Sequence, residues 1–197
     1  LHSLSFFDGI PLEKVREITG IYDNTFNHTL VGLRLSHYAN GVSKLHGEVS
    51  RDMWKDFSGI CPITHITNAQ NKKYWADAWL DEALQNKDRE ALIKRKTRLK
   101  SKLFDVVADQ TGKLFDPKIL TIVWARRFAE YKRPDLITRD YNRFIKLLSN
   151  TDKPVQIIFA GKPYPMDFGA IHNFDNLTHI SKNIKNMAVL TGHELKL

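Results

Sequence analysis

Cysteine is nearly absent from this sequence of 197 residues, and Cys61 stands alone. A single cysteine excludes an intramolecular disulfide and gives no cysteine spacing for a zinc site. The histidines also show no pairing at the spacing of metal ligands, so no metal site is predicted. A chain without disulfides fits a reducing compartment, and we expect a cytoplasmic protein.

Long apolar runs are also missing. No run approaches the roughly 18 apolar residues that a membrane-spanning helix needs, and no charged start followed by an apolar stretch indicates a signal peptide. Glycine is scarce at 10 residues, whereas hydrophobic residues make up 42% and aromatic residues 11% of the chain. This composition excludes a disordered or fibrous protein and predicts a packed core in one substantial domain or two small ones.

Acidic residues are outnumbered by basic ones, and the formal net charge is +8. Such an excess raises nucleic acid as a partner. The densest basic cluster, however, lies in a helical pattern whose apolar positions face elsewhere, which is typical of a solvated helix face. Nucleic acid is therefore not the expected partner. The cluster consists of Lys94, Arg95, Lys96, Arg98, Lys100 and Lys102.

The most informative stretch covers residues 119 to 133. It opens with an apolar run from Ile119 to Trp124, which predicts a strand covered on both faces. Pro134 then begins a helical pattern. Cations at the carboxyl end of a buried parallel strand lie where open α/β sheets bind ligands, and the N-terminus of the next helix also favours anions. The stretch thus predicts a phosphate site, with solvated surface charge as the alternative. Four cations follow the strand within eight residues: Arg126, Arg127, Lys132 and Arg133.

Two more apolar runs, at residues 155 to 160 and 187 to 190, predict further buried strands. Helical patterns over residues 135 to 149 and, less regularly, 166 to 182 separate the three strands. This alternation predicts an α/β fold with a parallel sheet and right-handed crossovers. Lys162 follows the second strand, so a second loop on the ligand-binding edge of the sheet also carries a cation.

The first third of the chain is predicted to be mainly helical. Asn24 or Thr25 is placed to cap a helix that runs to Ala39. Asn40 and Gly41 predict a break after it, and residues 63 to 68 predict a short extended segment. Apolar residues at helical spacing predict helices over residues 12 to 18, about 26 to 39, and 42 to 57.

Residues 69 to 112 predict a polar turn and then helices. Trp75 and Trp79 lie one turn apart in a helical stretch, where packing is a commoner role for tryptophan than ligand binding. Asp88 is placed to cap a long helix that runs to about Gln110, and Gly112 is placed to end it.

Three stretches resemble the α-glucan phosphorylases, the family of glycogen, starch and maltodextrin phosphorylases, and especially its shorter bacterial branch. The first includes Asn40-Gly41-Val42-Ser43 within residues 26 to 50, and the second is residues 63 to 68. The third runs from Ala125 to Arg133 and is followed by residues 157 to 162. Their order and spacing agree along nearly the whole chain. The sequence departs from the family after Asn68, where Ala69 stands in place of the usual glycine.

The resemblance implies the two-domain glycosyltransferase architecture called GT-B, with this chain as its middle portion. Residues 1–68 would form the mostly helical C-terminal tail of the N-terminal domain, and residues 69–197 the first part of a Rossmann-like C-terminal domain. The implied reaction transfers a terminal α-1,4-linked glucosyl unit of an α-1,4-glucan to inorganic phosphate, giving glucose 1-phosphate, with pyridoxal phosphate as cofactor. The lysine that bonds the cofactor is expected after Leu197, so the fragment alone is expected to be inactive.

The family's functional positions can be carried over residue by residue. Arg127 and Lys132 are the implied catalytic residues, because they resemble the pair that holds the substrate phosphate. Arg126 resembles the residue that faces the cofactor phosphate. Fixed cations at these positions would offset the repulsion between two phosphates that lie close together. The residues implied to bind the glucosyl unit are Val42, Asn68 and Tyr131.

Two other functions are compatible with the sequence. A sugar-nucleotide-dependent GT-B glycosyltransferase also holds a diphosphate with an arginine and a lysine after a buried strand. A non-catalytic carbohydrate-binding relative could keep the fold, and the altered residues after Asn68 are the hint for it. The sequence leaves open the preferred glucan length and whether the protein forms a homo-oligomer.

Overall fold

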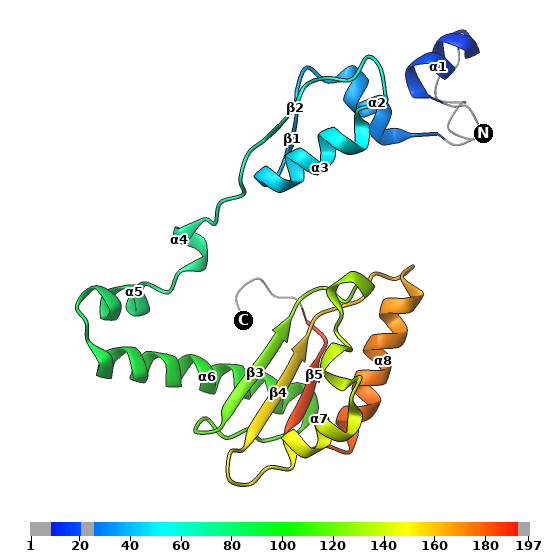
Figure 1. Cartoon of the computed structure of the whole chain (residues 1–197). Helices are drawn as coiled ribbons and strands as arrows, with labels where there is room; N and C mark the ends of the chain where they lie inside the picture. The colour runs from blue at the N-terminus through cyan, green and yellow to red at the C-terminus, as the bar shows by residue number, and fades with distance from the viewer. Residues whose placement is uncertain (1–8, 21–25, 193–197) are drawn as a thin grey trace. The chain divides into compact units, whose positions relative to one another are not determined.

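The computed structural model describes residues 9–20 and 26–192 (Figure 1). The chain forms two compact units, Leu1–Asn71 and Lys72–Leu197. The boundary between them follows Asn71, whereas the sequence placed a domain boundary after Asn68. Both units contain helices and parallel strands, so the predicted α/β class is confirmed. Within the described ranges, no helix combines the length and the apolar character needed to cross a membrane.

The first unit packs helices around a two-stranded parallel sheet in which Ala39 lies opposite Ile63. Its small core contains the buried side chains of Leu33, Cys61 and Ile63. The described elements of this unit are α1 (Leu12–Thr19), α2 (His28–Leu35), β1 (Ala39–Gly41), α3 (Lys44–Trp54) and β2 (Ile63–His65).

Helix boundaries in the first unit follow their capping residues. α1 ends at Gly20, which has a φ of 65°, as predicted. α2 begins where the side chain of Asn27 accepts a hydrogen bond from the backbone N–H of Leu30 at 3.0 Å; the predicted caps at positions 24 and 25 lie outside the described residues. The prediction that this helix continues to Ala39 is wrong, because Ala39 to Gly41 pair with β2 as a strand.

α3 approaches the two strands almost backbone to backbone. A Cβ added to Gly41 would lie 2.5 Å from the backbone nitrogen of Gly47, and a Cβ on Gly47 would lie 2.9 Å from the carbonyl oxygen of Thr64. Two glycines therefore set the packing of this helix. The apolar residues that predicted its buried side are exposed in this unit instead: Leu45, Val49 and Met53.

The second unit is built on a parallel sheet of strand order β3-β4-β5 (Figure 1). The predicted strands at 155 to 160 and 187 to 190 are confirmed at those bounds. Its elements are α4 (Lys72–Trp75), α5 (Ala78–Gln85), α6 (Arg89–Thr111), β3 (Leu120–Ala125), the 3-10 turns η2 (Glu130–Lys132) and η3 (Leu136–Thr138), α7 (Tyr141–Leu148), β4 (Val155–Ala160), α8 (Phe168–Lys182) and β5 (Met187–Leu190).

Helices cover both faces of this sheet. On one face, Phe144 of α7 and Leu177 of α8 pack against Ile157. On the other face, Phe104 and Val107 of α6 pack against side chains from β4 and β5. β4 is consequently buried along its whole length, as a central parallel strand should be.

β3 differs from the sequence prediction. It pairs with β4 on one side and forms an edge of the described sheet. Leu120, Ile122 and Val123 are 63%, 38% and 46% exposed. The prediction that this apolar run is covered on both faces is therefore wrong for the described chain, because α6, α7 and α8 pack mainly against β4 and β5. Hydrophobicity indicates that a strand seeks cover but not which strands the helices cover.

Two helix predictions also change. The predicted helix from Asp135 is broken, because η3 is followed by a new helix whose N-cap is Asp140. Trp75 and Trp79 belong to different helices, because Asp77 caps α5 by accepting from the N–H of Leu80 at 3.0 Å. By contrast, α6 begins after its predicted cap at position 88 and ends at its predicted glycine, position 112.

Candidate functional site

The two loops that leave the carboxyl ends of β3 and β4 are joined by backbone hydrogen bonds. The N–H of Arg126 donates to the carbonyl of Ala160 at 3.0 Å, and the N–H of Phe128 donates to the carbonyl of Lys162 at 3.1 Å. Phe128 also forms an isolated parallel bridge with Pro163. The parallel pairing of the strands thus continues into the loops that carry the predicted cations.

Buried residues fix the first loop on the sheet. Phe128 is 1% exposed, and its ring contacts the rings of Trp124 and Phe174 at centroid distances of 4.8 and 5.0 Å. A Cβ at Gly161 would overlap the carbonyl oxygen of Arg126, so the second loop can lie against the first only with glycine at this position. The loop is therefore held by packing from below and by close backbone contact from the side.

The predicted cations follow one another along this anchored loop. Arg126 and Arg127 are exposed, and Lys132 is half-buried at the end of η2. The Nζ of Lys132 lies 4.7 Å from the centroid of the Tyr131 ring. Among the described residues, no carboxylate forms an ion pair with any of these cations. Their positive charge is consequently available to an anionic ligand.

One part of the predicted phosphate site is not present. The sequence placed a helix N-terminus directly after the cations, but α7 starts only at Tyr141. Its first turn is already capped, because the carboxylate of Asp140 accepts from the N–H of Arg143 at 3.0 Å. The side chains of the loop, rather than a helix N-terminus, carry the charge.

The first unit brings together two of the predicted glucosyl-binding residues. The N–H of Asn68 donates to the carbonyl of Val42 at 3.0 Å, and both residues are exposed. The N–H of Val42 in turn donates to Nδ1 of His46 at 3.0 Å. His46 fixes this loop and was missed by the sequence analysis; its position in the first turn of the following helix was the available signal.

The predicted site residues therefore form two groups. Arg126, Arg127, Tyr131 and Lys132 lie on one loop of the second unit. Val42 and Asn68 lie in the first unit.

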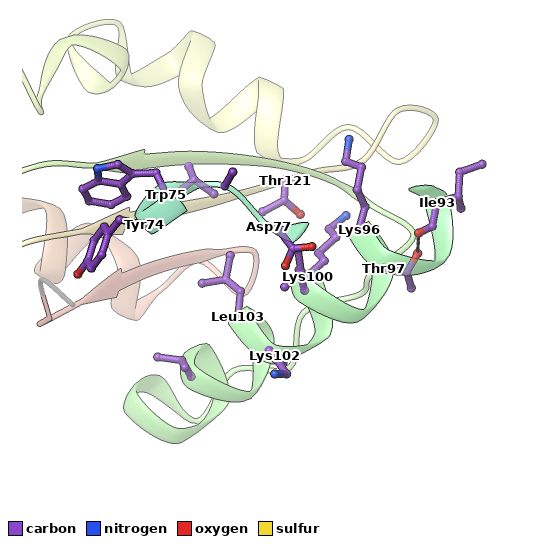
Figure 2. A pocket seen from close by; sticks show the side chains of 14 residues that line it. Tyr74, Trp75, Asp77, Ile93, Lys96, Thr97, Lys100, Lys102, Leu103 and Thr121 are labelled. Atoms are coloured by element: carbon purple, nitrogen blue, oxygen red, sulfur yellow. Dashed lines mark hydrogen bonds between the residues drawn. The ribbon is translucent and has the colours of Figure 1, made fainter. Parts of the chain in front are cut away.

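A cavity of about 900 Å³ lies elsewhere in the second unit, between the α4 segment, α6 and β3 (Figure 2). Tyr74 and Trp75 line one part of it, and side chains of α6 such as Leu103 line another. It contains none of the predicted site residues. Thr121 and Val123 also line it, so the cavity lies over a face of β3 that no described helix covers closely.

An ion pair beside this cavity is structural. Nη2 of Arg95 lies 2.5 Å from the Asp77 carboxylate, and the guanidinium stacks 4.0 Å from the centroid of the Trp79 ring. Hydrogen bonding from Arg95 lowers the pKa of Asp77 below its ordinary value. The carboxylate thus links α5 to α6. In the described ranges, no cluster of three His, Cys, Asp or Glu residues could hold a metal ion.

Comparison with known proteins gives no matching family model. An uncharacterized protein of Methanocaldococcus jannaschii is 43% identical over 197 residues, covering 100% of this chain and 37% of that protein. The maltodextrin phosphorylase of Thermococcus litoralis is 32% identical over 202 residues, covering 82% of this chain and 24% of that enzyme. The glycogen phosphorylase of Aquifex aeolicus is also 32% identical over 202 residues, covering 81% of this chain and 29% of that enzyme.

The chain thus spans between 24% and 37% of the length of these relatives. Similarity to several phosphorylases over about 80% of the chain agrees with the three motifs quoted from the sequence. This chain is therefore related to the α-glucan phosphorylases, the family that its motifs predicted, over a stretch corresponding to part of their length.

Proposed function

We propose that this chain supplies the phosphate-binding part of an α-glucan phosphorylase. Such an enzyme transfers a terminal α-1,4-linked glucosyl unit to inorganic phosphate and releases glucose 1-phosphate. The main support is the run of cations, without described ion-pair partners, on an anchored loop at the carboxyl end of β3, where open α/β sheets bind ligands. The names of the relatives support the same reaction.

In this proposal, Arg127 and Lys132 hold the substrate phosphate. A guanidinium can donate two parallel hydrogen bonds to phosphate oxygens, and an ammonium adds a compact point charge. Phe128 lies between these two residues in the sequence. Its side chain is buried and keeps the loop in place before a ligand arrives. Charges fixed in advance stabilise an anion without the cost of reorganising the protein.

Arg126 is the residue that would hold the phosphate of pyridoxal phosphate. Its side chain is exposed and forms no described ion pair, so its charge suits an anionic group. When bound, the cofactor would supply that phosphate as a proton partner for the substrate phosphate. We expect the lysine that bonds the cofactor to come from outside this chain.

Val42, Asn68 and Tyr131 would contact the glucosyl unit. The backbone of Val42 is held at two groups: its carbonyl accepts from the N–H of Asn68, and its N–H donates to His46. The Val42 loop can therefore present a defined surface to a sugar. We further propose that residues 1–68 belong to the N-terminal domain and residues 69–197 to the C-terminal domain of a GT-B enzyme.

Phosphate binding by the purified chain tests this proposal. Inorganic phosphate is titrated calorimetrically at constant ionic strength into wild type, Arg127→Gln and Arg98→Gln. Loss of one charge-assisted contact of roughly 1.5–3 kcal/mol should weaken binding about 10- to 100-fold in Arg127→Gln. Arg98→Gln makes the same charge change on α6 and should bind like wild type.

The same titration separates the alternative functions. Tighter binding of a uridine diphosphate sugar than of phosphate would favour a sugar-nucleotide-dependent transferase. Equal weakening in both variants would show general charge attraction and refute the assignment of Arg127. The chain alone should release no glucose 1-phosphate from maltodextrin and phosphate, and release at a rate above that of Arg127→Gln would contradict the proposed inactivity.

A further inference from the structure

Arg127 and Lys162 occupy matching positions on neighbouring parallel segments. The register of β3 and β4 runs from Leu120 opposite Val155 to Ala125 opposite Ala160. The bridge between Phe128 and Pro163 keeps the same offset beyond the strands. Counting along this register places position 127 opposite position 162.

Backbone contacts on both sides support this pairing. The N–H groups of residues 126 and 128 donate to the carbonyls of residues 160 and 162, which is the alternating pattern of a parallel ladder. Gly161 lies directly against the Arg126 carbonyl, so no side chain separates the two segments there. Matching residues of neighbouring strands lie about 4.8 Å apart in the hydrogen-bonding direction, and their side chains share a face of the sheet.

Both side chains are positively charged and exposed. Neither forms an ion pair with a described carboxylate. Two like charges at adjacent positions repel each other, and an anion bound between them would remove that repulsion. The arrangement is therefore more favourable with an anion bound than without one.

We propose that Lys162 is a further phosphate-binding residue, which binds the same inorganic phosphate as Arg127 and Lys132. This inference rests on the proposed function, because it adds a residue to that site. The second loop then contributes a cation from β4 to an anion held mainly by the loop after β3. The close contact of the two loops, which depends on Gly161, keeps positions 127 and 162 side by side, so that the ammonium of Lys162 can reach an anion bound by Arg127.

The test measures inorganic phosphate binding to the purified chain at constant ionic strength for wild type and four variants. Lys162→Met removes the proposed contact, and Lys162→Arg keeps the charge. Lys153→Met is the matched control, because Lys153 is an exposed lysine before the amino end of β4. Arg127→Gln reports on the proposed site itself. Urea unfolding in phosphate-free buffer checks that each variant is folded.

We expect Lys162→Met to weaken phosphate binding about tenfold, corresponding to one charge-assisted hydrogen bond. Lys162→Arg should restore most of that loss, and Lys153→Met should bind like wild type. In phosphate-free buffer, Lys162→Met should be at least as resistant to urea as wild type, because the repulsion from Arg127 is gone.

Two results would overturn the inference in different ways. If Arg127→Gln loses phosphate affinity while Lys162→Met binds like Lys153→Met, Lys162 lies outside the site and the proposed function stands. If wild type and Arg127→Gln take up phosphate equally weakly, the proposed site itself fails, and the role of Lys162 fails with it.

Discussion

Gly161 lies so close to the carbonyl oxygen of Arg126 that a Cβ at position 161 would overlap it. The atom in the way belongs to the backbone, so no side-chain rotation can relieve the overlap. The ring of Phe128 is also within 3.2 Å of the added atom. The position of the cationic loop therefore depends on the absence of a side chain on the neighbouring loop.

Gly161→Ala should weaken phosphate binding and reduce the free energy of unfolding by about 1–3 kcal/mol, as overpacking does elsewhere. Gly169→Ala is the matched control. Gly169 is an exposed residue of α8 where an added Cβ would be 3.7 Å from the nearest atom, and alanine favours the helix there. Urea unfolding and phosphate titration measure both effects; equal stability of the two variants would contradict the close contact.

Much of the second unit could be predicted from the sequence because its signals are local. β4 and β5 are short apolar runs bounded by polar turns, and both proved to be fully buried strands. The long helix α6 has an aspartate cap at one end and a glycine in the left-handed conformation at the other. Such features depend on a few neighbouring residues, so they can be predicted without knowing the rest of the fold.

The errors concern properties that depend on distant residues. The apolar run of β3 could not show that it lies at an edge of the described sheet, because that depends on strand order. α3 turns its glycine toward the strands, a preference for close backbone packing that hydrophobicity does not encode. The break between Trp75 and Trp79 was visible in principle, since Asp77 is a good capping residue.

The candidate site was predictable to a similar degree. The motif placed Arg126, Arg127 and Lys132 on one loop after a strand, and the structure agrees. The contacts of His46 with Val42 and the register that sets Lys162 opposite Arg127 connect loops whose relation only the folded backbone defines.

Asp77 and Arg95 should make the stability of the second unit depend on acid pH. The pKa of Asp77 is lowered in the folded state, chiefly by its hydrogen bonds with Arg95. Its stabilising contribution should be complete above the ordinary aspartate pKa of about 3.9 and be lost as pH falls through the lower folded value.

Asp77→Asn isolates this effect, because asparagine still caps α5 but carries no charge. The difference in free energy of unfolding between wild type and this variant, measured by urea titration from pH 6 to roughly pH 2.5, should shrink as the acid range is entered. A difference that does not change with pH would show that the ion pair adds nothing beyond the cap.

Lys113 should stabilise the junction between α8 and β5. Its ammonium donates to the carbonyls of Ile184 at 3.0 Å and Met187 at 2.8 Å, and to that of Ser181. Lys113→Met would remove the hydrogen bonds that the ammonium donates to these carbonyls and should lower the free energy of unfolding by about 1–3 kcal/mol. Lys118→Met, at a nearby exposed lysine, should change it by less than about 0.5 kcal/mol.

The pH dependence of Lys113 has the opposite sign from that of Asp77. Burial lowers the pKa of Lys113, so the unfolded chain holds more protons between the folded value and the ordinary lysine pKa of about 10.4. Wild type should therefore gain stability as pH rises through that window, and Lys113→Met should lack this gain. Parallel curves for the two proteins would contradict a partly buried ammonium at this junction.

The exposed edge of β3 should promote self-association of the isolated chain. An edge strand with unpaired backbone groups and exposed apolar side chains invites pairing with another strand. Ile122→Lys places a charge in the middle of that edge and should reduce association, measured by sedimentation velocity over a range of protein concentrations.

Leu114→Lys is the control, because Leu114 is 89% exposed but lies in the loop before the strand. If both substitutions reduce association equally, general charge repulsion is responsible, and a wild-type chain that stays monomeric at every concentration would show that this edge does not pair.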